Sequence, residues 1–250
     1  MIYVTGDIHG EYWRCNDSYF PEQDEMTKND YLIICGDFGG IWDPVEGISE
    51  KELFHWLENR PFTTLFIDGN HENFDRLYNY PVEEWHGGKV HKISPSVIHL
   101  MRGQIFTLDN MKIFTFGGAA SHDISGGILD PSDPDFKTKE LELRRSEKSC
   151  RINYFSWWAQ ELPTDEEMQE GLNNLAACDN KVDVIITHCC PSSIQKLLDD
   201  DKYSTNTLTD YLEQIHQDVE YKKWYFGHYH RNRNMSDKDV LLYRQFLRIS

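Results

Sequence analysis

Short apolar runs recur along the chain, and each ends abruptly at a glycine or a polar residue. The runs are rich in β-branched and aromatic residues, which is typical of buried strands. They cover residues 2–5, 31–35, 63–67, 112–116, 182–187 and 223–226. The pattern therefore predicts six buried strands spread over most of the sequence.

Helical patterns lie between the predicted strands. Ser49 has the position of an N-cap, with Glu52 three residues later as its capping-box partner. Thr164 and Glu167 repeat this signature before a second helix. A third amphipathic stripe has the apolar side chains Leu208, Tyr211, Leu212 and Ile215. Strands and helices therefore alternate, as in an α/β protein.

Residues 97–116 have a different pattern, in which strand-like runs follow one another with only turns between them. Arg102-Gly103 and Asp109-Asn110 are turn signals. We expect an antiparallel pair here, and therefore a mixed sheet.

A chain of 250 residues is long enough for one large domain or two small ones. We expect a single domain, residues 1–250, with an insertion over one edge at about residues 121–163. Glycine, proline and charged residues dominate the first part of that segment, and an aromatic cluster follows. The acidic run Asp199–Asp201 is expected to be a solvated loop.

The net charge of −17 makes a long nucleic acid an unlikely partner, because its phosphates would meet a mostly repulsive surface. The six cysteines show no Cys-x-x-Cys spacing, which favours a reducing compartment. Neither a signal peptide nor a stretch of membrane-spanning length is evident. We expect a soluble cytoplasmic protein without a membrane partner.

Polar residues that can bind metals or transfer protons follow five of the predicted strands. They occur in Asp7-Ile8-His9-Gly10, Gly36-Asp37, Gly69-Asn70-His71-Glu72, Thr187-His188 and Gly227-His228-Tyr229-His230. In open α/β sheets, ligands bind beyond the carboxyl ends of the strands, so five distant segments can meet in one crevice. Carboxylate and imidazole donors together suit a transition metal.

These five motifs, in this order, resemble those of the calcineurin-like metallophosphoesterase superfamily over residues 5–230. The resemblance implies a four-layer sandwich of two mixed β-sheets flanked by helices. It implies that Asp37 bridges two metals and that His71 is the proton donor. The remaining implied ligands are Asp7, His9 and His230 for one metal, and Asn70, His188 and His228 for the other.

The implied chemistry is hydrolysis of a phosphate ester. Two metals can share a hydroxide that attacks phosphorus while they also bind the phosphoryl oxygens. An imidazole such as that of His71 can then protonate the leaving oxygen as a general acid. Mn or Fe is expected first, and Zn, Co or Ni would also suit these ligands.

One departure from the resemblance concerns the substrate. Protein-phosphatase-like members carry an Asp-Arg pair a few residues after Gly-Asp, whereas this chain continues Phe38-Gly39-Gly40-Ile41. Because Arg is the natural clamp for a phosphate dianion, its absence favours a diester or a small-molecule ester over a phosphoprotein. Arg102 or the insertion could supply another Arg. A small-molecule or nucleotide ester is the expected substrate.

Some residues outside the motifs have two interpretations. His122 follows a predicted strand and Gly117-Gly118, so it could touch substrate, although a plain loop position is the more ordinary interpretation. The basic group Arg144, Arg145, Lys148 and Arg151 is either a solvated helix face or a surface that steers an anion.

Two alternatives to the leading function remain open. One is a phosphomonoesterase acting on a phosphoprotein or a nucleotide. The other is a non-catalytic metal-binding scaffold that uses the fold for partner recognition. The presence of His71 together with all seven implied ligands favours an enzyme over the scaffold.

Overall fold

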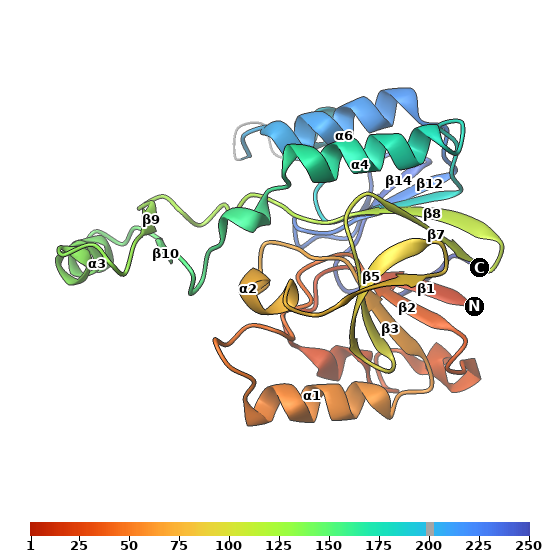
Figure 1. Ribbon diagram of the computed structural model, residues 1–250, viewed down its shortest axis with the longest axis horizontal. Helices are drawn as coiled ribbons and strands as arrows, with labels where there is room; N and C mark the ends of the chain where they lie inside the picture. The colour runs from red at the N-terminus through yellow and green to blue at the C-terminus, as the bar shows by residue number, and fades with distance from the viewer. Residues whose placement is uncertain (199–202) are drawn as a thin grey trace.

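Two mixed β-sheets form the centre of the protein in the computed structural model, which describes residues 1–198 and 203–250 (Figure 1). The acidic run Asp199–Asp201 lies outside the described residues. The seven-stranded sheet has the order β15 (Leu247–Arg248), β1 (Ile2–Thr5), β2 (Tyr31–Ile34), β3 (Thr63–Phe66), β6 (Val97–Leu100), β5 (Gly88–Ser94), β4 (Val82–Trp85). The six-stranded sheet has the order β13 (Arg233–Asn234), β14 (Asp239–Leu241), β12 (Lys223–Phe226), β11 (Val184–Thr187), β8 (Met111–Phe116), β7 (Gln104–Leu108).

Helices cover the outer faces of both sheets. The α-helices are α1 (Ile48–Glu58), α2 (Phe74–Leu77), α3 (Phe136–Arg145), α4 (Asp165–Ala176), α5 (Ser192–Gln195) and α6 (Thr207–Asp218). Short 3-10 turns are η1 (Tyr12–Cys15), η2 (Pro21–Glu25) and η3 (Ala159–Glu161). Figure 1 shows α1 on one side of the sandwich and α4 with α6 on the other. No helix in the described ranges has the length and apolar character needed to cross a bilayer.

Alternating side chains divide the core into three parts. In β1, Val4 packs between the two sheets with Ile186 of β11, whereas its neighbour Tyr3 packs in the layer that contains Leu53 of α1. On the far side, Leu212 of α6 packs with the residues of the second sheet. The result is four layers, helix, sheet, sheet and helix, which confirms the predicted fold class.

The six strands predicted from apolar runs are all present, with boundaries that differ by at most two residues. The predicted antiparallel pair is β7 with β8, joined at Asp109-Asn110. The turn at Arg102-Gly103 has another role, because it takes the chain from β6 in the first sheet to β7 in the second.

The predicted capping box at Ser49 is wrong. Helix α1 begins at Ile48 with Gly47 as its N-cap, so Ser49 lies inside the first turn and cannot cap it. The capping box of Thr164 with Glu167 is confirmed at the start of α4, where both reciprocal hydrogen bonds form. A sequence signature alone does not distinguish these two positions.

The segment between residues 121 and 163 forms an arm that extends from the sandwich (Figure 1). Its outer part holds the two-stranded sheet of β9 (Ile128–Leu129) and β10 (Arg151–Ile152), together with α3. Helix α3 has no buried residue, whereas Trp158 at the inner end of the segment is buried and donates a hydrogen bond to Asp75. The inner end is thus anchored to the sandwich.

Candidate metal centre

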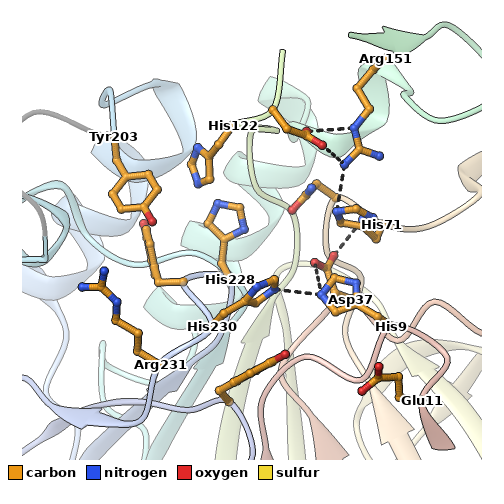
Figure 2. A pocket seen from close by; sticks show the side chains of 14 residues that line it. His9, Glu11, Asp37, His71, His122, Arg151, Tyr203, His228, His230 and Arg231 are labelled. Atoms are coloured by element: carbon orange, nitrogen blue, oxygen red, sulfur yellow. Dashed lines mark hydrogen bonds and ion pairs between the residues drawn. The ribbon is translucent and has the colours of Figure 1, made fainter. Parts of the chain in front are cut away.

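Five of the seven predicted ligands line one pocket: His9, Asp37, Asn70, His228 and His230 (Figure 2). The other two, Asp7 and His188, are buried behind them and contact His230 and Asp37. Strands β1, β2 and β3 run parallel in the first sheet, and β11 and β12 run parallel in the second. Their carboxyl ends therefore open to the same end of the sandwich. The first sheet supplies Asp7, His9, Asp37 and Asn70, and the second supplies His188, His228 and His230.

Four of these side chains form a compact cluster that could hold a metal ion. One donor atom from each of Asp7, His9, Asp37 and His230 lies within 4.8 Å of the others. The Nε2 atoms of His9 and His230 are 2.9 Å apart, and Nε2 of His230 is 3.1 Å from Oδ2 of Asp7. Imidazole and carboxylate donors in this arrangement match the preferences of first-row transition metals.

The other three side chains carry buried polar atoms that are unsatisfied within the described chain. These atoms are Oδ1 of Asn70, Nε2 of His188 and Nε2 of His228. The two imidazole rings are 5.0 Å apart, and Nε2 of His188 lies 3.3 Å from Oδ1 of Asp37. A buried polar atom without a hydrogen bond costs about 1–3 kcal/mol, so three such atoms in one place fit a second cation.

Hydrogen bonds behind the cluster fix the orientation of its members. Nδ1–H of His188 donates to the carbonyl of Cys35 at 2.7 Å, which directs Nε2 toward Asp37. The backbone N–H of His228 donates to the Asp7 carboxylate at 2.9 Å, and that of His71 donates to Asp37 at 2.8 Å. These hydrogen bonds hold both carboxylates in place at the centre.

The backbone at the centre adopts conformations that non-glycine residues rarely take. The φ angles of His9, Asp37, His228 and His230 are 50°, 47°, 71° and 50°. A Cβ atom on Gly69 would lie 2.0 Å from Oδ1 of Asp37, so only glycine fits there. Such strain at one place is a feature of functional sites.

Burial and neighbouring charges shift the pKa values at the centre. Burial opposes the charged form of Asp37, but the charge and hydrogen bond of His188 hold the pKa of this carboxyl well below its usual range. Burial also opposes the charged form of His188, yet Asp37 raises its pKa to about 9. For His228, burial lowers the pKa well below its usual value. Without a metal, the ionised Asp37 carboxylate thus lies beside a protonated His188, and metal coordination would displace that proton.

His71, the predicted proton donor, lies at the same end of the sandwich. Its ring stacks against that of Trp42, with the two centroids 5.6 Å apart. Its Nε2 is 3.1 Å from Nη2 of Arg151 (Figure 2). Because guanidinium only donates, Nε2 of His71 is the acceptor. Burial lowers the pKa of His71 to about 4.

His122 and Arg151 enter the pocket from the segment that follows β8. The ring of His122 lies 4.3 Å from that of His228, centroid to centroid, so His122 faces the centre. Sequence reasoning placed Arg151 only in a basic group, because nothing in the sequence shows how β10 folds back toward His71. Arg102, the other Arg considered for this site, is buried in an ion pair with Asp68 at 2.5 Å.

The pocket around these groups has a volume of about 720 Å³, and both polar and apolar atoms line it. Charged and aromatic side chains that sequence reasoning did not assign to the site also line it: Glu11, Asp123, Tyr203, Tyr229, Arg231 and Tyr243. This size suits a small molecule or a short part of a larger one.

The protein is a four-layer α/β sandwich in which Asp and His side chains that could hold a metal converge beyond the strand ends. The sequence model of the calcineurin-like phosphoesterases matches residues 1–232, and the chain belongs to this family. Membership of this family supports a metallophosphoesterase. The family uses divalent metals, and the cluster of Asp7, His9, Asp37 and His230 is a possible site for them.

Three curated relatives are similar to parts of the chain. Lariat debranching enzyme A of Xenopus laevis is 25% identical over 143 residues, which is 52% of this chain and 26% of the relative. The lariat debranching enzyme of Danio rerio is 23% identical over 159 residues, 57% of this chain and 27% of the relative. That of Drosophila pseudoobscura pseudoobscura is 23% identical over 207 residues, 77% of this chain and 33% of the relative. The chain spans a third or less of each.

Proposed function

We propose that this protein is a dinuclear metal-dependent hydrolase of phosphate esters. In this proposal Asp7, His9 and His230 hold one metal, Asp37 bridges, and the second metal is held by Asn70, His188 and His228. The observation that carries the proposal is the group of three buried, unsatisfied donor atoms directly beside the four-residue cluster. One cation would satisfy the cluster, and a second would satisfy the three remaining atoms.

When bound, the metals would supply a nucleophilic hydroxide and neutralise the phosphoryl oxygens. The protein's own groups hold the donors and handle the leaving-group proton. His71 lies next to Asn70 with its Nε2 directed at the pocket, where it can protonate a departing oxygen. A negatively charged ester beside the ring favours its protonated form, which offsets the lowering of its pKa by burial.

Mn or Fe is the proposed metal, and Zn, Co or Ni would also suit the imidazole, carboxylate and amide donors. We propose that residues 1–250 form one domain, because β15 near the end of the chain pairs with β1 at its beginning. His122, 4.3 Å from His228, is proposed to contact the substrate.

The proposed substrate is a small-molecule or nucleotide ester, chosen from the chain's own pocket because the relatives match over a third or less of their length. The missing Asp-Arg pair favoured a diester. Because Arg151 provides a guanidinium in the pocket, the absence of that pair no longer favours a diester over a monoester. Both monoester and diester activity therefore need measurement.

Replacement of Asp37 by Asn tests the proposal. We expect about two metals per wild-type chain by elemental mass spectrometry after loading with Mn. The Asp37→Asn protein should bind less metal and hydrolyse p-nitrophenyl phosphate or bis-p-nitrophenyl phosphate at least about 100-fold more slowly, because the bridging charge is lost.

The matched control is Asp237→Asn, at an exposed position remote from the pocket. It should retain the metal content and turnover of the wild type. A well-folded wild-type protein that bound no metal and hydrolysed neither ester would instead support the scaffold alternative.

A further inference from the structure

The arm delivers a guanidinium to the edge of the candidate metal centre. Arg151 lies in β10, outside the sandwich, yet its side chain reaches back to His71 and is only 11% exposed (Figure 2). The pocket lining includes Arg151 next to His71 and Asp37. A long, charged side chain is rarely held this way without a partner or a task.

Three groups hold this guanidinium in a fixed orientation. Asp123 accepts hydrogen bonds from Nε at 2.9 Å and from Nη2 at 2.8 Å, which is the bidentate arrangement. The carbonyl of Ser156 accepts from Nη1 at 3.2 Å. The remaining contact, from Nη2 to Nε2 of His71 at 3.1 Å, is the one directed at the pocket.

The partner at that last contact is a poor match for a cation. A neutral imidazole nitrogen is a weaker acceptor for a guanidinium than an anionic oxygen, with which the hydrogen bond is charge-assisted. A phosphoryl oxygen entering the pocket would therefore be the better acceptor for Nη2. The exchange would also release Nε2 of His71 for the leaving oxygen.

The charges that line the pocket, rather than the total charge of the arm, give Arg151 its importance for an anionic ligand. The arm, residues 121–163, contains six Lys and Arg against eight Asp and Glu, a net charge of −2. The acidic side chains Asp37, Asp123 and Glu11 also line the pocket, so an anion needs a cation on the protein side. Arg151 is the member of the basic group that lines the pocket.

We propose that Arg151 binds the phosphoryl group of the substrate and that Asp123 positions it. The proposal rests on the function proposed above, and it supplies the phosphate clamp that is missing after Asp37. It assigns the arm a direct part in substrate binding, since its β10 strand carries the clamp.

The test compares Arg151→Ala and Arg151→Lys with the control Arg144→Ala. Arg144 belongs to the same basic group, but its side chain is 75% exposed on α3 and pairs with Glu140. Binding of inorganic phosphate to the Mn-loaded proteins is measured by calorimetry. Steady-state kinetics with p-nitrophenyl phosphate, elemental analysis and thermal melting complete the comparison.

We expect Arg151→Ala to bind inorganic phosphate roughly 10- to 100-fold more weakly than the wild type, because a charge-assisted donor is lost. KM should rise and metal content should stay unchanged. Phosphate binding by Arg151→Lys should be intermediate, because Lys keeps the positive charge but lacks the planar set of donors of a guanidinium. The control should remain within about twofold of the wild type. Asp123→Asn should raise KM less than Arg151→Ala does.

Failure of this inference differs from failure of the proposed function. Equal phosphate binding by Arg151→Ala and the control, or loss of metal from Arg151→Ala, would overturn the role of Arg151 alone. A wild type that binds no phosphate would overturn it as well. If the wild type binds phosphate through Arg151 but hydrolyses no ester, the role of Arg151 in phosphate binding stands and the proposed hydrolase activity is rejected.

Discussion

At the scale of single residues, the centre depends on backbone conformations that no periodic pattern reveals. His9, Asp37, His228 and His230 all lie in the left-handed region. Three neighbouring glycines, Gly36, Gly69 and Gly227, each follow a predicted strand in the sequence. The sequence thus indicated which residues would converge, whereas the left-handed backbone of four of them is visible only in the structure.

A second set of buried polar residues lies beneath the centre and was not predicted from the sequence. Asp68 at the end of β3 accepts hydrogen bonds from Arg102, and Nε2 of His99 is 3.1 Å from its other oxygen. Nδ1 of His99 is in turn 3.0 Å from Nδ1 of His91. The members are far apart in sequence, so no local motif indicates that they meet.

This network predicts a pH-dependent loss of stability. Burial, and the neighbouring His99, lower the pKa of His91 to about 4, whereas Asp68 acts in the opposite direction. The unfolded chain takes up this proton near pH 6.5, so the stabilisation is complete above that pH and is lost as the pH falls toward 4. Between about pH 7 and pH 5 the wild type should lose roughly 2 kcal/mol more than His91→Gln does.

Urea unfolding of both proteins at the two pH values, in EDTA to exclude metal, measures this difference. His99, Asp68 and the ring of Tyr78, 5.9 Å away, face His91 and are common to both proteins. Parallel pH dependence of the two free energies of unfolding would show that His91 does not titrate as described.

At the scale of elements, apolar runs predicted most of the buried strands, but they missed β14 of the second sheet and the strands at the edge of the first sheet. The hairpin of β4 and β5 was missed, although its His86-Gly87 turn has positive φ at both residues, as a tight hairpin requires. Strand β4 is mostly exposed, so its sequence lacks the apolar run that marks a buried strand. Partner strands distant in sequence, such as β15 beside β1, leave no local signal at all.

The two Ser/Thr-x-x-Glu signatures predict different effects of mutation. Thr164→Ala should destabilise the protein by about 1 kcal/mol, because it removes the side-chain acceptor of a formed capping box. Ser49→Ala is the matched control, because Ser49 is exposed within the first turn of α1 and caps nothing. Its effect should stay within about 0.5 kcal/mol.

Chemical denaturation monitored by circular dichroism gives both free energies of unfolding. Equal losses from the two variants would contradict the difference in capping, and a larger loss from Ser49→Ala would reverse it.

At the scale of the whole molecule, the arm and the sandwich differ in how they are held. Helix α3 has no buried side chain, whereas the strands on either side of the arm, β8 and β11, pair directly with each other. Trypsin should therefore cleave native protein first within residues 137–151. The two fragments should stay associated, because β8 with β11 and β1 with β15 join them.

Mass spectrometry of a short digest locates the cuts, and gel filtration without denaturant tests the association. First cuts outside the arm, or separate elution of the fragments, would contradict this arrangement. Loss of phosphate-ester turnover on nicking would in addition agree with the clamp carried by β10.

The proposed donor set draws on nearly the whole length of the chain, from Asp7 to His230. During synthesis the first four donors, Asp7 to Asn70, leave the ribosome more than 100 residues before His188 does. A nascent chain would therefore lack the complete donor set until His230 has emerged. Metal acquisition would then follow the synthesis of this whole span, set by the ion supply that the folded protein meets.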